Sequence, residues 1–359
     1  MSCCEPLENA GRSSWEMSEQ GLLRPINRRT VLKGMVGTVA GLILGGSGIG
    51  LAQNRRIRLA FCSQLLCVVP YEFTRSQGFF EAEGLDVELV YTRGGSAALQ
   101  ALVGGAVEYA ATSFDAALQA FSNGAQIRRF ATTGRLPLFA LATAPERASE
   151  IQDFTDLEGA IVGVSALGNG DHVLMLYLLE RAGVDPDSVQ FATLGVNLYD
   201  ALRLGQVDAG WVQEPSLTLI REAGGGVLFN AMNIEQAQEY LGGAYEFMGV
   251  SVRADELDER LEEMQALGRA LGNGLRALKE VPPAELVASL PTELVAGGNL
   301  AQLEQILAEH RDSLYPDSVT IDVEAAARVV ESQRTAGLLE EDVDLNTLLA
   351  TGVLGGQGG

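Results

Sequence analysis

The sequence has 359 residues, about twice the size of an ordinary domain of roughly 150 residues, so two lobes are expected. Hydrophobic residues make up 47% and charged residues 20% of the chain, which excludes a disordered or fibrous protein and leaves enough apolar residues for a large core. The formal net charge of −22 argues against a nucleic-acid-binding protein, because little basic surface is left to offset the repulsion by phosphates.

A leader is predicted at residues 1–52. The pair Arg28-Arg29 is followed by Val31, Leu32 and Lys33, and then by an uncharged, glycine-rich stretch that ends at Ala52. This pattern is similar to a twin-arginine export signal, with Ala52 as the small residue at the cleavage site. An uncleaved membrane anchor is the alternative, although so short and glycine-rich a stretch makes a poor span. We therefore expect the mature chain to be exported to the periplasm.

Strand and helix patterns alternate after the leader. Strands are predicted at 57–61, 85–90, 107–111 and 127–132, with helices at 71–83, 94–102 and 115–121. A second series has strands at 161–164, 189–193 and 209–212 and helices at 171–182, 198–204 and 215–222. Such alternation predicts mainly parallel α/β sheets. After Ser251 the pattern predicts helices alone, at 256–279, 283–289, 300–310 and 323–335.

The two series share a short sequence echo. Ala101-Leu102, Gly105 and Val107-Glu108 recur as Ala201-Leu202, Gly205 and Val207-Asp208. A duplicated lobe and the common pattern of βα units both explain this echo.

Polar turns follow most of the predicted strands. In open parallel sheets, ligands gather beyond the carboxyl ends of the strands, where backbone N–H groups and small polar side chains hold anionic or polar molecules. The predicted turns are 62–64, 94–96, 112–113, 132–135, 165–170, 195–197 and 213–214.

The parts of common enzymes are missing from the sequence. His172, at a predicted helix start, is a candidate ligand contact, and His310 is expected to be exposed near a helix end. No Gly-x-Ser-x-Gly motif accompanies them, no nucleotide-binding glycine motif occurs in the mature chain, and Lys279 lies among charged helical residues. We therefore predict no catalytic residue, no cofactor and no metal site.

Cys62 and Cys67 are the cysteines that remain after the leader. In an oxidising periplasm they either form a disulfide that fixes the first ligand loop or remain two buried thiols. Trp211 and Tyr199 either stack on a ligand or belong to the core.

Four motifs carry a family resemblance: Gln77–Leu89 (QGFFEAEGLDVEL), Gly94-Gly-Ser96 with Gln100-Ala-Leu102, Asp156-Leu-Glu-Gly159 before Val162-Gly-Val-Ser165, and Gly205-Gln-Val-Asp208 with Glu214-Pro215. With them, most of residues 56–340 resembles the solute-binding proteins of ABC importers for nitrate, sulfonate, taurine or bicarbonate, and the related binders of thiamine-pyrimidine precursors.

The resemblance implies a two-lobed periplasmic binding protein, type II-like, with the ligand cleft between the lobes. Lobe 1 would comprise 53–141 and 248–345, lobe 2 would comprise 142–247, and 346–359 would be a flexible tail. The lobes would close about hinges near 139–143 and 247–252.

The resemblance also implies a set of ligand contacts. In the first lobe these are Ser63, Gln64, Gly95, Ser96 and Ser113, and in the second they are Ser165, Gly168, Asn169 and Asn197. Arg135, with Arg93 behind it, is the candidate for binding an anionic group. Glu214 would accept a hydrogen bond from a ligand amine or cap its helix, so zwitterionic or heteroaromatic solutes are favoured over a bare anion.

The implied function is capture of a small polar or anionic solute, sulfonate- or taurine-like, nitrate-like or pyrimidine-precursor-like, by a monomer. The monomer would deliver the solute to an inner-membrane ABC permease and ATPase. The alternatives are an exported enzyme acting on a pyrimidine or sulfur compound through Cys62 or His172, and an assembly factor with the same fold. The enzymatic relatives carry a dense cysteine run that this sequence lacks, which disfavours the enzyme.

Overall fold

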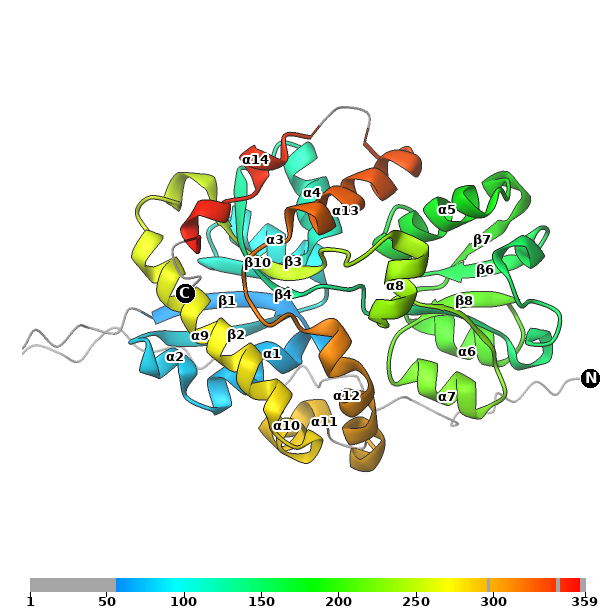
Figure 1. Ribbon diagram of the computed structural model, residues 1–359, viewed down its shortest axis with the longest axis horizontal. Helices are drawn as coiled ribbons and strands as arrows, with labels where there is room; N and C mark the ends of the chain where they lie inside the picture. Colours follow the sequence, from blue (N-terminus) through cyan, green and yellow to red (C-terminus); the bar gives the residue numbers. More distant parts are fainter. Residues whose placement is uncertain (1–55, 296–297, 340–342, 356–359) are drawn as a thin grey trace, which may run out of the picture. The chain divides into compact units, whose positions relative to one another are not determined.

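Two five-stranded sheets form the framework of the protein (Figure 1). The computed structural model describes residues 56–295, 298–339 and 343–355, so the predicted leader lies outside the described residues. Within this part of the chain, no helix is both long enough and apolar enough to cross a membrane.

The first sheet has the order β2-β1-β3-β10-β4. β1 pairs in parallel with β2 and β3, and β10 runs antiparallel between β3 and β4. The bounds are β1 Arg56–Cys62, β2 Asp86–Thr92, β3 Tyr109–Ser113, β4 Ile127–Gly134 and β10 Met248–Arg253.

The second sheet repeats this arrangement in the order β7-β6-β8-β5-β9. β6 pairs in parallel with β7 and β8, and β5 runs antiparallel between β8 and β9. The bounds are β5 Ala140–Thr143, β6 Ile161–Val164, β7 Gln190–Thr193, β8 Ala209–Val212 and β9 Val227–Asn230. Each sheet thus has one reversed strand among four of common direction, which confirms the predicted mainly parallel α/β fold.

The chain passes between the sheets twice. It leaves β4 and enters β5 through residues 135–139, and it returns from β9 through helix α8 (Ile234–Leu241) and residues 242–247 to β10. The reversed strand of each sheet, β5 or β10, is the strand that the chain enters directly after a crossing. β5 and β10 each lie wholly within one sheet, so the connections just before them join the two sheets.

The sequence echo has the same geometry in both sheets. The Glu108 carboxylate accepts a hydrogen bond from the backbone N–H of Arg58 on β1 at 2.8 Å, and Asp208 accepts one from Ile161 on β6 at 2.8 Å. Gly105 and Gly205 make the preceding turns at φ of 72° and 66°, a left-handed conformation that favours glycine. Glu108 thus joins the start of β3 to the neighbouring strand β1, and Asp208 joins the start of β8 to the neighbouring strand β6.

Helices follow the strands as the alternation predicts. They are α3 Gly95–Val103, α4 Phe114–Ser122, α5 Gly170–Ala182, α6 Leu198–Arg203 and α7 Ser216–Glu222. The first predicted helix, 71–83, is wrong in its bounds, because α1 spans Leu65–Ser76 and α2 spans Phe79–Ala82, with a break at Gly78 (φ 73°).

Pro70 lies inside α1, where proline usually disrupts a helix. Proline has no N–H for the carbonyl four residues earlier, which belongs to Leu66. The Tyr315 hydroxyl donates to that Leu66 carbonyl at 2.8 Å instead. A side chain distant in sequence thus compensates for the lost helical hydrogen bond.

In the described residues after β10, the named elements are all helical, as predicted: α9 Leu261–Glu280, α10 Pro283–Ser289, α11 Thr292–Val295, α12 Leu300–Leu314, α13 Val323–Thr335 and α14 Leu345–Leu348. α9 packs along α1 and α2, while α13 packs against both α4 and α5 (Figure 1).

The expectation of a flexible tail at 346–359 is wrong for residues 346–355. Leu348, Leu349, Val353 and Leu354 are buried, and the N–H of Ala350 donates to the carbonyl of Arg129 on β4 at 2.7 Å. The apolar residues of this segment pack against the first sheet. The flexible tail was predicted from the glycine-rich end of the sequence, which follows these apolar residues.

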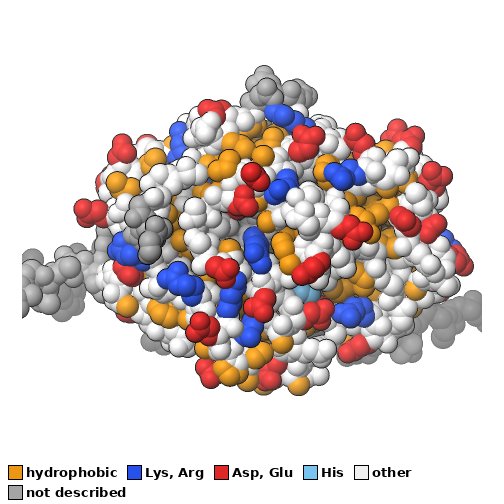
Figure 2. Space-filling model, in the orientation of Figure 1, with side chains coloured by type: hydrophobic (Ala, Val, Ile, Leu, Met, Phe, Trp, Pro, Cys, Tyr) orange, Lys and Arg blue, Asp and Glu red, His pale blue; other side chains and the backbone are white. Residues whose placement is uncertain are grey.

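Acidic and basic side chains are interspersed on the face drawn in Figure 2, so the negative net charge is not gathered there into one patch.

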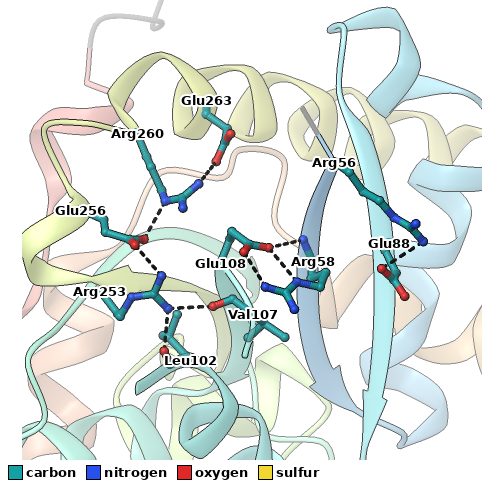
Figure 3. A network of polar contacts seen from close by, with 10 residues as sticks. All are labelled: Arg56, Arg58, Glu88, Leu102, Val107, Glu108, Arg253, Glu256, Arg260 and Glu263. Carbon is teal, nitrogen blue, oxygen red and sulfur yellow. Dashed lines mark hydrogen bonds and ion pairs between the residues drawn. The ribbon is translucent and has the colours of Figure 1, made fainter. Parts of the chain in front are cut away.

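A cluster of ion pairs lies at the amino ends of β1 and β3 (Figure 3). In it, Arg253 donates to the carbonyls of Leu102 at 2.7 Å and Val107 at 2.8 Å, and pairs with Glu256. Arg253 thus joins the end of β10 to the turn before β3 and to the segment that leads into α9.

We expect Arg253→Met to lower the free energy of unfolding by about 1.5–3 kcal/mol, the usual loss for hydrogen bonds to a charged group that is largely removed from water. Arg56→Met is the matched control. Arg56 is 65% exposed and pairs with Glu88 at 3.1 Å, so its loss should change stability by no more than about 0.5 kcal/mol. Urea unfolding of both variants measures the difference, and equal losses would show that the cluster acts as ordinary surface charge.

Candidate functional site

A cavity of about 930 Å³ is lined by residues from turns that follow strands of both sheets. Its walls come from the segments that follow β1, β2, β3, β6, β7 and β8, including the first turns of α3, α4 and α5. This is the edge at which parallel α/β sheets bind ligands, because helix N-termini present free N–H groups there.

Half of the predicted contacts line this cavity. They are Gln64, Gly95, Ser96, Ser113, Ser165 and Asn169. Ser113 also caps α4, since its Oγ accepts a hydrogen bond from the N–H of Ala116 at 3.3 Å.

Four other predicted contacts do not line the cavity. Ser63 donates to the Thr92 carbonyl at 2.8 Å, and Asn197 belongs to the turn before α6. The N–H of Gly168 donates to Nδ1 of His172 at 3.1 Å, and the His172 ring packs edge-on against Phe191 with the centroids 4.8 Å apart. The side chains of Ser63 and His172 thus stabilise turns around the cavity.

The prediction that Arg135 faces the ligand is wrong. Its guanidinium donates to the carbonyls of Ser313 at 2.8 Å and Asp312 at 2.7 Å, at the end of α12. The last carbonyls of a helix have no partner within the helix, and an arginine is a common partner for them. Arg93 is the arginine that lines the cavity.

Glu214 also lies off the cavity wall. Its carboxylate accepts hydrogen bonds from the N–H of Thr218 at 3.1 Å and from the Thr218 hydroxyl at 2.9 Å, so of the two roles left open it takes that of a helix cap. His310 is 2% exposed and lies 3.2 Å from the other Glu214 oxygen, so the expectation of an exposed His310 is wrong. The exposure of His310 was mispredicted because its partner, Glu214, is distant in sequence.

Two carboxylates at helix starts line the cavity instead. Asp171 accepts hydrogen bonds from the N–H of Ser165 at 2.6 Å and from the Ser165 hydroxyl at 2.8 Å, and burial raises its pKa. Asp115 accepts one from the Tyr245 hydroxyl at 3.1 Å, and burial raises its pKa to about 6. Both residues begin predicted helices, 115–121 and 171–182, but neither was among the predicted ligand contacts.

Asp115 is 3% exposed, yet its Oδ2 has no hydrogen-bond partner among the described residues. The atom is buried beside Gly170, at the start of α5 in the other lobe: a Cβ on Gly170 would stand 3.6 Å from it. A buried acceptor without a partner is costly, so this oxygen is suited to a ligand donor.

Aromatic residues form part of the same cavity. Phe139, Trp211 and Phe247 line it, with the Phe139 ring edge-on to Trp211 at 5.2 Å and to Phe247 at 5.9 Å. Tyr199 lines it as well. The Trp211 Nε1 is buried and finds no acceptor in the described part of the chain, which makes it a second unsatisfied polar group in the wall.

The cationic end of the cavity is formed by Arg93 and the start of α3. Gly94 precedes this helix with a φ of 138°, a backbone conformation that favours glycine. The first turn of α3 contains no acidic residue. Its free N–H groups therefore favour an anionic group, unlike the first turns of α4 and α5, which contain Asp115 and Asp171.

Residues 68–285 match the family model described as NMT1/THI5 like. No curated protein sequence matches the chain significantly.

Solved structures share the fold at low sequence identity. The aliphatic sulphonate binding protein SsuA of Escherichia coli is 20% identical with a TM-score of 0.63, covering 82% of this chain and 91% of its own. The nitrate-binding protein NrtA of Synechocystis is 11% identical with a TM-score of 0.63, covering 84% and 87%. A Candida albicans protein described as having the generic periplasmic binding protein fold is 19% identical with a TM-score of 0.63, covering 82% and 96%.

Proposed function

Because the chain belongs to the NMT1/THI5-like family, we propose that it is the solute-binding component of an ABC importer. The observation that carries this proposal is the cavity of about 930 Å³ lined by helix N-termini of both lobes. Its volume lies at the upper end of the usual range of roughly 300–1,000 Å³ for ligand sites. Sulfonate- and nitrate-binding proteins have the same fold, which supports the assignment.

We further propose that the lobes close on the solute about the two crossings. The predicted lobes are 53–141 with 248–345, and 142–247. Because β5 lies wholly in the second sheet and β10 wholly in the first, we assign the bending to residues 135–139 and 242–247, just before the predicted hinges. Residues 140–141 then belong with lobe 2 and residues 346–355 with lobe 1. A twin-arginine leader at 1–52 would export the monomer to the periplasm, where it would deliver the solute to an inner-membrane permease and ATPase. The enzymatic alternative depends on Cys62 or His172, and His172 does not line the cavity, which supports solute binding over that alternative.

The favoured solute carries a hydrogen-bond donor as well as an acceptor. Asp115 takes the acceptor role first considered for Glu214, and Trp211 Nε1 offers a donor. A bare anion would meet Asp115 and Asp171 as well as Arg93. Taurine-like zwitterions and amino-substituted pyrimidines satisfy both kinds of wall group, and the aromatic residues favour a planar ring.

Thermal unfolding of residues 53–359 with a solute panel tests the function. The panel comprises taurine, ethanesulfonate, nitrate, bicarbonate and aminopyrimidine precursors of thiamine. A bound solute at about 100 times its Kd adds roughly 2.7 kcal/mol, which raises the Tm of a chain of this size by several degrees. Taurine and ethanesulfonate differ only in the amine, so a larger shift with taurine would assign the donor. A folded protein whose Tm is unchanged by every solute would contradict the proposed solute classes.

A further inference from the structure

Cys62 and Cys67 lie in the wall of the cavity, and the solute-binding function makes no use of their chemistry. Cys62 is the last residue of β1 and Cys67 lies in the first turn of α1. Their Sγ atoms are 2.7 Å apart and unbonded, about 0.7 Å more than an S–S bond length. A small movement of the turn between them would join them.

The two thiols are not equivalent. Cys67 is 1% exposed and Cys62 is 6% exposed, and both line the cavity. The hydrogen bond with Cys67 lowers the pKa of Cys62, whereas burial raises the pKa of Cys67 well above its usual value. Cys62 is therefore the more exposed thiol and the one that forms a thiolate more readily, and Cys67 is the more deeply buried thiol behind it.

We propose that Cys62 and Cys67 are a reversible disulfide site in the cavity wall, oxidised through the cavity by small organic disulfides. The Cys62 thiolate attacks one sulfur of the disulfide RSSR, forms a mixed disulfide and expels RS⁻, which takes up a proton. Cys67 then loses its proton and attacks Cys62 Sγ, so that the intramolecular bond forms and a second RSH leaves. Two thiols are oxidised and one disulfide is reduced to two thiols.

The site has consequences for the cavity. The bond would tie the end of β1 to the first turn of α1 and fix the segment 62–67, which places Gln64 in the wall. It would also remove both thiol protons from a region where Gln64 Oε1 lies 3.6 Å from Cys67 Sγ. This inference does not depend on the identity of the solute.

The test uses the full chain with Cys3 and Cys4 replaced by serine, so that Cys62 and Cys67 are the remaining thiols. The reduced protein is incubated with oxidised glutathione, and intact mass and iodoacetamide labelling are followed. We expect both thiols to disappear together, with a mass loss of two hydrogens and no retained glutathione, and dithiothreitol to restore them. Two retained glutathiones, or two thiols that persist in excess oxidant, would overturn the proposal.

Single variants test the order of the steps. Cys67→Ser should trap one glutathione on Cys62, because no second thiol displaces it. Cys62→Ser should leave Cys67 unmodified in the folded protein and reactive in guanidinium chloride, which also reports that the variant is folded. Equal glutathione uptake by both folded variants would contradict the assignment of Cys62 as the attacking thiol.

Met248 provides the control against a soft-metal site, because its Sδ lies 3.5 Å from Cys67 Sγ in the same wall. Two thiols and a thioether are ligands that Cu(I) or Ag(I) prefers. Met248→Leu should leave disulfide formation unchanged. Stabilisation of the reduced protein by Ag(I) that Met248→Leu abolishes, together with resistance to oxidised glutathione, would replace the disulfide site by a metal site.

Discussion

Arg129→Ala is expected to lower the free energy of unfolding by about 3–5 kcal/mol, because it removes one partner of a buried charge pair. Arg129 is fully buried on β4, and its guanidinium donates to the carbonyls of Thr112 at 3.0 Å and Phe247 at 2.7 Å and pairs with Glu246 at 3.3 Å. It thereby joins β3, β4 and the crossing before β10. Without it, the Glu246 carboxylate and two carbonyls lose their charged partner.

The pH dependence of the stability loss tests whether Arg129 acts by compensating the charge of Glu246. Burial raises the pKa of Glu246 to about 7 even with Arg129 opposing it. A carboxyl with a raised folded pKa contributes stability that is complete at low pH and is lost as the pH rises to the folded value, here between about pH 4.5 and 7. Removing Arg129 raises this pKa further, so the variant should continue to lose stability above pH 7, where the unmodified protein no longer does.

Urea unfolding at pH 5.5 and pH 8 measures both effects. The control is the double variant Arg129→Met/Glu246→Gln, which removes both charges and should recover a large part of the loss. A loss below about 1 kcal/mol at pH 8, or a loss independent of pH, would show that Arg129 does not compensate a buried charge.

The fold was largely predictable because its signals are local. β6 and β8 have the predicted bounds, since short apolar runs flanked by polar turns mark buried strands. The errors arise where the local conformation depends on a contact with a residue that is distant in sequence. Pro70 is accommodated in α1 by Tyr315, and residues 349 and 350 are held by their contacts with β4.

The site was predictable as an edge of two sheets, but not side chain by side chain. Parallel strands bring their following turns together, so Gln64, Ser96 and Asn169 reach the cavity as expected. Which of two neighbouring residues faces inward depends on remote partners. Gln213 lines the cavity, while the adjacent Glu214 is held by His310 on α12. The choice between Arg93 and Arg135 likewise depends on the end of α12.

Asp115→Asn is expected to weaken the binding of amine-bearing solutes such as taurine by about ten- to a hundredfold, the equivalent of the roughly 1.5–3 kcal/mol of a hydrogen bond to a charged group. The carboxylate offers Oδ2 as an acceptor without a partner in the described chain, and the amide keeps the shape while losing the charge. Titration calorimetry of both proteins measures the change. Glu214→Gln is the matched control, because Glu214 lies off the cavity wall and its replacement should leave affinity unchanged.

The sign of the pH dependence separates the two classes of solute. Because burial raises the pKa of Asp115 to about 6, this side chain changes from neutral to negative between about pH 5 and 7. Taurine, whose amine stays protonated, should therefore bind more tightly as the pH rises through 6, whereas ethanesulfonate should bind less tightly because the new charge repels it. Asp115→Asn should flatten both profiles and improve ethanesulfonate binding. Profiles that persist unchanged in Asp115→Asn but flatten in Glu214→Gln would return the role of ligand acceptor to Glu214.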